Sequence, residues 1–218
     1  MNDSMNNITL AGRVHSTPVY DHTLYGEAFF KMEIAASRLS GVEDILPVTV
    51  SERLLGDSII DIGTQVEIIG QIRSYNQRVG ENNHLVITAF AREFNTVADG
   101  SEDIDNASNE DYISPNKNEV ELCGHICKQV VYRQTPFSRE IADILVAVNR
   151  RYGKSDYLPC IAWGRNARYA RELSIGDTIQ IKGRMQSRPY QKTLSDGTVE
   201  ERMAYEISCS TIEGRERY

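Results

Sequence analysis

The chain contains the same sequence pattern twice. "NNITLAGRV" at residues 6–14 corresponds to "NEVELCGHI" at residues 118–126. "IGTQVEIIGQIRSY", which begins at residue 62, corresponds to "IGDTIQIKGRMQSR", which begins at residue 175. The order of the signals is the same in both copies. A repeat of this length predicts two similar domains rather than one large core.

The two copies are separated by a polar, acidic segment, "ADGSEDIDNASNEDYISPNKN", at residues 98–118. A segment of this composition has too little apolar surface to build a core. We therefore expect a first domain at residues 1–97, an acidic linker at residues 98–118 and a second domain at residues 119–218.

Apolar and polar residues alternate with a period of two, which is typical of strands. In the second copy this alternation predicts strands at 142–149, 157–163 and 178–190, and a last strand at 203–212. A short helix is expected at 166–173, between the second and the third of these strands. An Asp-Gly turn in "LSDGT" precedes that last strand. The order of elements fits an OB-fold. The expected fold class is all-β, with two five-stranded OB-fold barrels in tandem, each with a short helix between strands 3 and 4.

The side chains of residues 178–190 divide between two faces. Ile179, Ile181, Gly183 and Met185 form an apolar face, and Gln180, Lys182, Arg184, Gln186, Arg188 and Tyr190 form the other. On 157–163, taken as a neighbouring strand, Tyr157, Pro159, Ile161 and Trp163 face away from Leu158, Cys160 and Ala162. Rings stack on bases and cations hold phosphates, so this face suits a nucleic acid single strand.

A simpler interpretation applies to each signal taken alone. A Trp on a strand is commonly well-packed apolar surface, and Arg168 and Arg171 fit the solvated side of a helix. The binding face is favoured because Tyr157, Trp163, Lys182, Arg184, Arg188 and Tyr190 all lie opposite the apolar sets.

The segment "DYLPCIAWGRNARYARELSIGDTIQIKGRMQSRPY" resembles bacterial single-stranded DNA-binding protein, and the resemblance extends over nearly all of residues 118–213. It implies an OB-fold, an assembly of four such domains and sequence-tolerant binding of single-stranded DNA. It places the base-stacking rings at Tyr152, Tyr157, Trp163 and Tyr190, and cationic contacts at Arg150, Arg151, Lys182, Arg184 and Arg188. Because each chain carries two domains, we expect a homodimer.

The first copy keeps the apolar frame and loses the face. Ile45 stands at the position of Tyr157, Ser51 at that of Trp163, Ile69 at that of Lys182 and Gln71 at that of Arg184. Arg38, Arg73 and Tyr75 remain as plausible contacts, and Tyr20, Tyr25 and Phe29 offer a different surface. The first copy thus builds the same frame without the run "PCIAWGRNARYA", so the fold does not require this run. This difference between the copies assigns DNA binding mainly to the second domain.

The charge distribution agrees with this division. The chain has a net charge of −7, but residues 119–218 carry 16 Lys and Arg against 13 Asp and Glu, whereas residues 1–97 carry 7 against 12. The local field decides which surface attracts a polyanion.

Other classes of site find no support in the sequence. His15, His22, His84 and His125 are scattered, and "GRNAR" lacks the lysine and spacing of a phosphate loop. Cys123, Cys127, Cys160 and Cys209 do not have zinc-site spacing, so we expect free thiols, no metal and no cofactor. No apolar run approaches the ~20 residues of a membrane span, and the N-terminus lacks the features of a signal peptide. We expect a cytoplasmic, nucleoid-associated protein without a membrane partner.

The favoured function is non-enzymatic binding of single-stranded DNA in replication, recombination or repair, with replication or repair proteins as further partners. Two alternatives stay open. One is a primosome-like accessory protein for replication restart, and the other is a tandem-OB scaffold that binds protein and little DNA.

Overall fold

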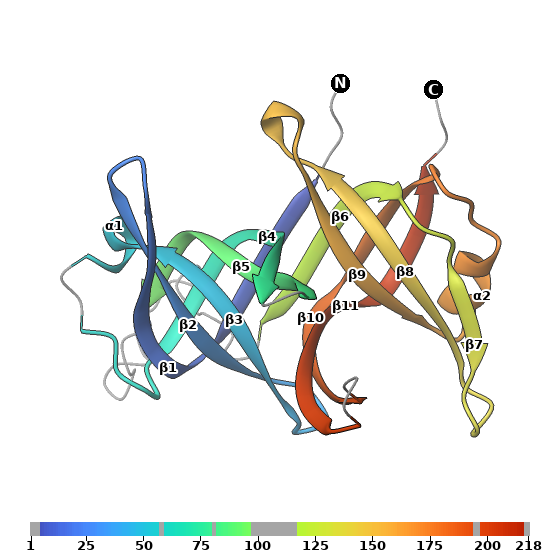
Figure 1. Cartoon of the computed structure of the whole chain (residues 1–218), viewed down its shortest axis with the longest axis horizontal. Coiled ribbons are helices and arrows are strands. Elements are labelled where there is room, and N and C mark those ends of the chain that lie inside the picture. The colour runs from blue at the N-terminus through green and yellow to red at the C-terminus, as the bar shows by residue number, and fades with distance from the viewer. Residues whose placement is uncertain (1–4, 57–58, 80–81, 97–116, 194–196, 216–218) are drawn as a thin grey trace, which may run out of the picture. The chain divides into compact units, whose positions relative to one another are not determined.

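The structure is a computed structural model that describes residues 5–56, 59–79, 82–96, 117–193 and 197–215 (Figure 1). Most of the linker predicted at 98–118 lies outside these residues. The chain divides into two compact units. Unit 1 comprises Met1–Asn6, Ser74–Ile87 and Val120–Tyr218, and unit 2 comprises Asn7–Arg73 and Thr88–Glu119. The domain limits expected from the sequence stay a prediction.

The first copy forms a closed five-stranded barrel. Its strands are β1 (Asn6–Leu24), β2 (Glu27–Ser37), β3 (Glu43–Ser51), β4 (Gln65–Val79) and β5 (Asn82–Thr96), and the short helix α1 (Glu52–Leu55) follows β3. The strands pair in the order β1–β2–β3–β5–β4, and β4 returns to β1. β3 and β5 are parallel, whereas β1 pairs with β2 and β4 in antiparallel fashion.

The second copy repeats this arrangement. It contains β6 (Asn118–Ile126), β8 (Glu140–Asn149), β9 (Ser155–Trp163), β10 (Thr178–Thr193) and β11 (Val199–Arg215), with α2 (Arg165–Arg171) after β9 and a 3-10 turn, η1 (Arg151–Gly153), after β8. The order β6–β8–β9–β11–β10–β6 closes the barrel. The sequence did not predict the short strand β7 (Val131–Gln134), which pairs with β8. The all-β OB-fold class is confirmed, including a helix between the third and fourth barrel strands.

Both helices are short. Among the residues that the structure describes, no helix has the length and hydrophobicity needed to cross a membrane.

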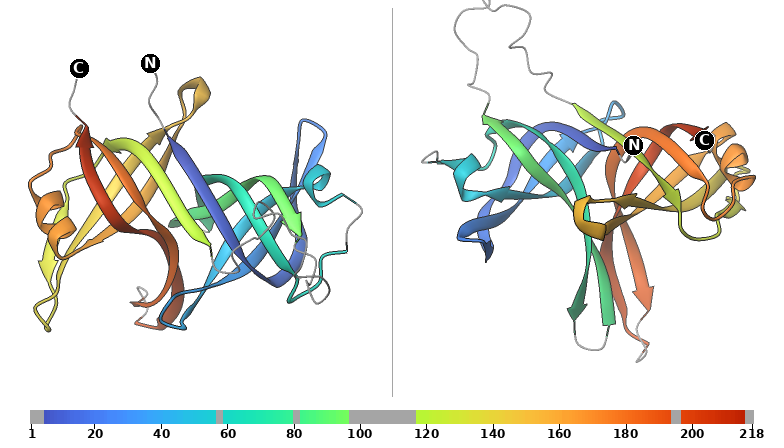
Figure 2. Two further views of the ribbon diagram at one scale, coloured as in Figure 1. Left: turned by 180° about the vertical axis from the view of Figure 1, so that it is seen from behind. Right: turned by 90° about the horizontal axis from the view of Figure 1, so that it is seen from above.

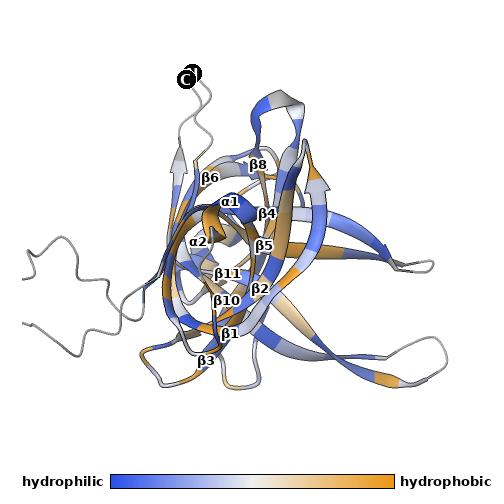
Figure 3. Cartoon of the chain, turned by 90° about the vertical axis from the view of Figure 1, so that its left-hand side faces the viewer, coloured by the Kyte–Doolittle hydropathy of each residue, from blue (hydrophilic) through white to orange (hydrophobic). Residues whose placement is uncertain are grey.

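The barrel cores use equivalent positions of the repeat. Leu10, Ile34 and Leu46 in the first copy and Leu122, Val146 and Leu158 in the second are fully buried. Hydrophobic and hydrophilic residues alternate along the strands (Figure 3), because successive side chains of a strand point to opposite faces. The period of two in the sequence therefore separates core from surface in both barrels.

A long hairpin extends from the second barrel. β10 and β11 pair from Thr178 with Arg215 to Thr193 with Val199, with a register shift between Lys182 and Gly183. Figure 2 shows the outer half of this hairpin as a two-stranded arm. Unit 1 also contains the outer part of β4 and β5, where His84 Nδ1 lies 3.3 Å from Arg202 Nη1 of the arm.

Each barrel has a glycine where two strands approach closely. A Cβ on Gly183 would lie 2.2 Å from the carbonyl oxygen of Ser208, and one on Gly70 would lie 2.1 Å from that of Phe90. These glycines occupy equivalent places in the repeat, on β10 and β4. The close approach explains why neither position accepts a side chain without a shift of backbone.

We predict that Gly183→Ala lowers the free energy of unfolding by about 1–3 kcal/mol, the usual cost of overpacking. Gly70→Ala is expected to have a similar effect, because its Cβ would meet a backbone oxygen at a similar distance. Denaturant unfolding measures both, and Gln180→Ala, on the polar face of β10, is the control. Unfolding of both alanine variants at the denaturant concentration of the unchanged chain would contradict the argument.

Candidate nucleic-acid interface

Two aromatic rings project from β9. The side chains of Tyr157 and Trp163 are 47% and 41% exposed, while Leu158, Cys160 and Ala162 are buried on the opposite face of the strand. Ile161 was expected on the open face with the rings, but only 4% of it is exposed. The open face of β9 is therefore narrower than the alternation predicts, with the two rings near its two ends.

The rings and the cationic row do not lie on neighbouring strands, which corrects the expectation from the sequence. β9 pairs with β11 at Cys160 and Ile161, and β10 pairs with the other edge of β11. This order arises because the last strand of the barrel inserts between the third and the fourth. The predicted face thus spans β9, β11 and β10.

The cations of β10 have polar neighbours. Lys182 Nζ lies 2.8 Å from Glu121 Oε1 on β6, and Arg188 Nε lies 3.5 Å from Glu206 Oε1 on β11. The hydrogen bond and charge of Glu121 raise the pKa of Lys182. Phosphates that approach Lys182 or Arg188 must compete with these carboxylates.

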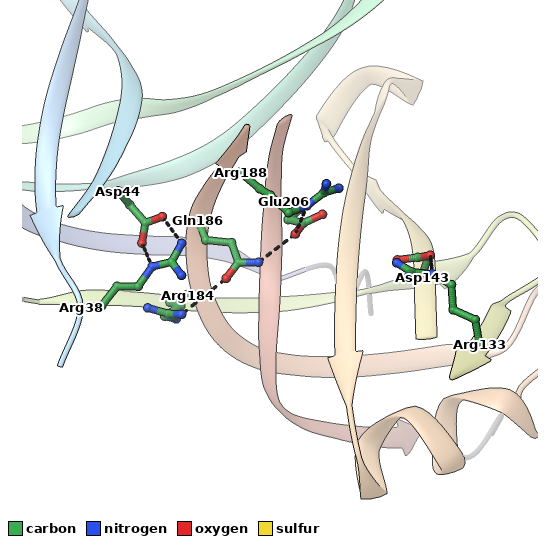
Figure 4. A network of polar contacts seen from close by, with 8 residues as sticks. All are labelled: Arg38, Asp44, Arg133, Asp143, Arg184, Gln186, Arg188 and Glu206. Carbon is green, nitrogen blue, oxygen red and sulfur yellow. Dashed lines mark hydrogen bonds and ion pairs between the residues drawn. The ribbon is translucent and has the colours of Figure 1, made fainter. Parts of the chain in front are cut away.

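A buried polar contact interrupts the cationic row. Gln186 was expected on the open face with the cations, but it is 6% exposed and donates from Nε2 to Glu206 Oε1 at 2.8 Å (Figure 4). Arg184 Nη2 donates to Gln186 Oε1 at 3.4 Å. Glu206 faces Gln186 directly across the β10–β11 ladder. Gln186 and Glu206 therefore link Arg184 to Arg188 within the hairpin.

Arg150 is placed differently from the other predicted contacts. Its guanidinium forms a two-pronged pair with Asp156, whose carboxylate is fully buried, and its Nη2 also donates to the carbonyl oxygen of Ser74 at 3.0 Å. Arg151 is exposed in η1. The side chain of Tyr152 lies outside the described part of the chain.

The first copy contains the counterpart of this ion pair. Arg38 donates from Nε and Nη2 to the two carboxylate oxygens of Asp44, at 2.8 and 2.6 Å, and Asp44 is fully buried (Figure 4). The spacing of six residues is the same as in the pair of Arg150 and Asp156. A pair kept in both copies belongs to the frame of the barrel.

Sequence reasoning did not select Arg202. It lies opposite Tyr190 in the β10–β11 register and pairs with Glu200 at 2.7 Å. The register of the β10–β11 hairpin places Arg202 opposite Tyr190. The Asp-Gly turn in "LSDGT" was the sequence signal from which this register could have been predicted. Arg202 joins Tyr190 as a candidate contact on the arm.

Residues 117–214 match the profile of the single-strand binding protein family. The chain resembles that family. Single-stranded DNA-binding protein 1 of Staphylococcus aureus is 33% identical over 81 residues, which are 34% of this chain and 48% of that protein. Single-stranded DNA-binding protein A of Bacillus subtilis is 32% identical over 81 residues and 47% of its length. The chain thus spans about half the length of these relatives.

A solved structure matches the whole chain. The wild-type single-stranded DNA binding protein from Thermus aquaticus has a TM-score of 0.73 and 18% sequence identity, with 99% of this chain and 95% of that chain covered. At this identity the match concerns the fold. The resemblance to the single-strand binding protein family, expected from residues 118–213, is confirmed.

Two of the three arginines of α2, Arg168 and Arg171, have partners at the surface. Arg168 Nη1 lies 3.0 Å from Glu140 Oε2, and Arg171 pairs with Glu172 and lies 5.1 Å from the centre of the Tyr132 ring. These contacts agree with the solvated side of a helix that the sequence indicated. In the second barrel, the rings of β9 and the cations of β10 remain the stronger candidates.

The first barrel presents a different surface at the equivalent places. Ser51, at the position of Trp163, is buried, and Ile69, at the position of Lys182, is 37% exposed. Aromatic side chains instead gather on β1 and β2, where Tyr20 packs edge-on against Phe30 and His22 stacks on Phe29. The Lys and Arg residues of β1 and β2 are Arg13 and Lys31, and they pair with Glu43 and Asp21.

Three of the four cysteines pack in the interior, and Cys127 is half-buried. Cys123, Cys160 and Cys209 are buried, and the neighbouring thiol of Cys209, together with burial, raises the pKa of Cys160. A thiol with a raised pKa is a poor nucleophile and metal ligand at neutral pH.

We predict that Glu121→Gln tightens binding of oligo-dT by roughly two- to fivefold at low salt, because an exposed ion pair of this kind is weak and phosphate replaces it. The variant removes the carboxylate that competes for Lys182. Glu119→Gln, two residues earlier on β6, is the control for the change in net charge. Equal affinities for the two variants would argue against competition at Lys182.

Proposed function

We propose that this protein binds single-stranded DNA without enzymatic activity, mainly through its second barrel. The observation that carries the proposal is the pair of exposed rings, Tyr157 and Trp163, on a barrel whose β10 carries Lys182, Arg184 and Arg188. Rings stack on bases of any type, and cations track the phosphates. The match of residues 117–214 to the single-strand binding protein family supports it.

The proposed contacts are the nine residues selected from the sequence: Tyr152, Tyr157, Trp163, Tyr190, Arg150, Arg151, Lys182, Arg184 and Arg188. Within this set we rank Arg150 lowest, because its guanidinium is already bound to Asp156 and Ser74. Replication, recombination or repair is the setting in which such binding is useful, since each exposes single strands.

The first barrel makes few direct contacts with DNA in this proposal. It keeps the fold but replaces the rings and cations, and residues 1–97 carry an excess of acidic residues. A strand of DNA that passes close to this surface is repelled rather than held. The barrel is then available for assembly or for contact with another protein.

We predict that oligo-dT quenches the fluorescence of Trp163, the sole Trp of the chain, and that Trp163→Ala and Tyr190→Ala each weaken binding by about 1–3 kcal/mol, as expected for a lost base stack. Anisotropy of a labelled oligonucleotide measures the affinity of the variant that lacks Trp. A duplex of the same length should compete poorly.

Tyr25→Ala is the matched control, because the Tyr25 ring is fully exposed on the first barrel. If Trp163→Ala and Tyr190→Ala are both folded and keep their affinity, the two rings do not stack on bases and are ordinary packed surface residues. A loss in Tyr25→Ala as large as theirs would assign binding to the first barrel too. No binding in any variant or in the unchanged chain would favour the protein-interaction scaffold.

We further propose a homodimer, because two chains bring together the four OB-folds that the family resemblance implies, and closed twofold assembly is the commonest oligomeric form. Light scattering at micromolar concentration should give twice the 24.6 kDa of one chain. A mass of one chain, or of four, would reject this assembly.

A further inference from the structure

Ser74 of β4 is held on three sides by residues of the second copy. Its N–H donates to Asp156 Oδ1 at 2.6 Å, and its carbonyl oxygen accepts from Arg150 Nη2 at 3.0 Å. Its Oγ accepts from the backbone N–H of Tyr157 at 2.7 Å. All these residues belong to unit 1. The ion pair of Arg150 and Asp156 thus forms hydrogen bonds with both the N–H and the carbonyl oxygen of Ser74, as a neighbouring strand would.

The site is buried and organised. Asp156 is fully buried and Ser74 is 6% exposed. A carboxylate in such surroundings requires partners for its oxygens, and Arg150 and the N–H of Ser74 supply them. The first copy has the equivalent pair of Arg38 and Asp44 although Ile45 and Ser51 replace the two rings, so the pair occurs in a barrel without these rings.

The contact lies at the beginning of β9, next to a proposed stacking ring. β11 pairs with β9 further along, at Cys160 and Ile161. At Tyr157, the hydroxyl of Ser74 therefore accepts the hydrogen bond from the backbone N–H that the carbonyl of a paired strand would otherwise accept. The ring of Tyr157 points outward at this position and is 47% exposed, so the backbone that carries the ring is fixed from β4.

We propose that Arg150 and Asp156 form a docking site for the backbone of Ser74, and that the docked strand positions Tyr157 for stacking on a base. Ser74, Arg150 and Asp156 are then positioning residues, and Tyr157 is the contact. The second part rests on the proposed function, whereas the docking itself does not. The first copy thereby contributes to DNA binding through its hairpin, without touching DNA.

One consequence concerns the division of the chain. Producing the two halves as separate chains would part Ser74 from Asp156 and Arg150, although these residues belong to the same compact unit. The role of each copy is therefore best tested in the full chain.

The experiment uses full-length Ser74→Ala, which keeps the backbone contacts and removes only the acceptor for the N–H of Tyr157. Loss of one hydrogen bond predicts oligo-dT affinity weaker by roughly three- to tenfold. Ser74→Thr retains an Oγ and should restore binding. Ser16→Ala is the matched control, because Ser16 Oγ also accepts a backbone N–H, that of Glu33, and both residues belong to unit 2.

A double-mutant cycle separates positioning from general stability. In a Tyr157→Ala background, Ser74→Ala should have no further effect on affinity, because the ring that it positions is absent. An equal loss in both backgrounds, or no loss when Tyr157 is present, would overturn the positioning role. If the unchanged chain fails to bind oligo-dT, the positioning role falls together with the proposed function.

Amide hydrogen exchange tests the docking without DNA and without a variant that must fold. In the unchanged chain, the amides of Ser74 and Tyr157 should exchange as slowly as those of the barrel strands. Rapid exchange at both would overturn the docking. In Ser74→Ala, the amide of Tyr157 should exchange faster while that of Ser74 stays protected by Asp156.

Discussion

Closure of the barrel is the constraint on which the rest of the structure depends. Each copy closes five strands in the same order, and the closure brings β10 so near β11 that Gly183 has no room for a Cβ beside the Ser208 carbonyl. Gly70 meets the same constraint beside Phe90. A closed barrel leaves few strand edges unpaired and turns alternate side chains inward. Once the frame is closed, only the outward positions are available for function.

The two copies show how a duplicated frame diverges. Buried positions such as Leu10 and Leu122 stay apolar, because a polar or smaller residue there would leave a cavity or an unpaired group. Outward positions are under no such constraint, and Ile69 stands where Lys182 stands in the second copy. The buried pairs of Arg38 with Asp44 and of Arg150 with Asp156 follow the core rather than the surface. Removing one partner of such a pair typically costs about 3–5 kcal/mol, which explains their retention.

The cations of the second barrel are not isolated charges. Glu121 lies beside Lys182, and Glu206 lies beside Arg188 and Gln186. These acidic neighbours hold the long side chains in place, and they also reduce the positive field that a phosphate meets. The result is a surface on which charge is oriented but partly compensated, so stacking by the exposed rings carries a larger share of the proposed affinity than the count of cations suggests.

The sequence by itself determined the repeat, the all-β class, the position of the helix between strands 3 and 4, and the outward direction of Tyr157 and Trp163, because all of these follow from local alternation and from comparison of one copy with the other. The tertiary structure decided the strand order, which separates β9 from β10 by β11. It also decided the burial of Ile161 and Gln186 and the pairing of Arg150 with Asp156 and Ser74. Alternation distinguishes the inside of a strand from its outside, but it does not show which other strand covers the outside. That depends on contacts between residues as distant as 74 and 156, which no local pattern records.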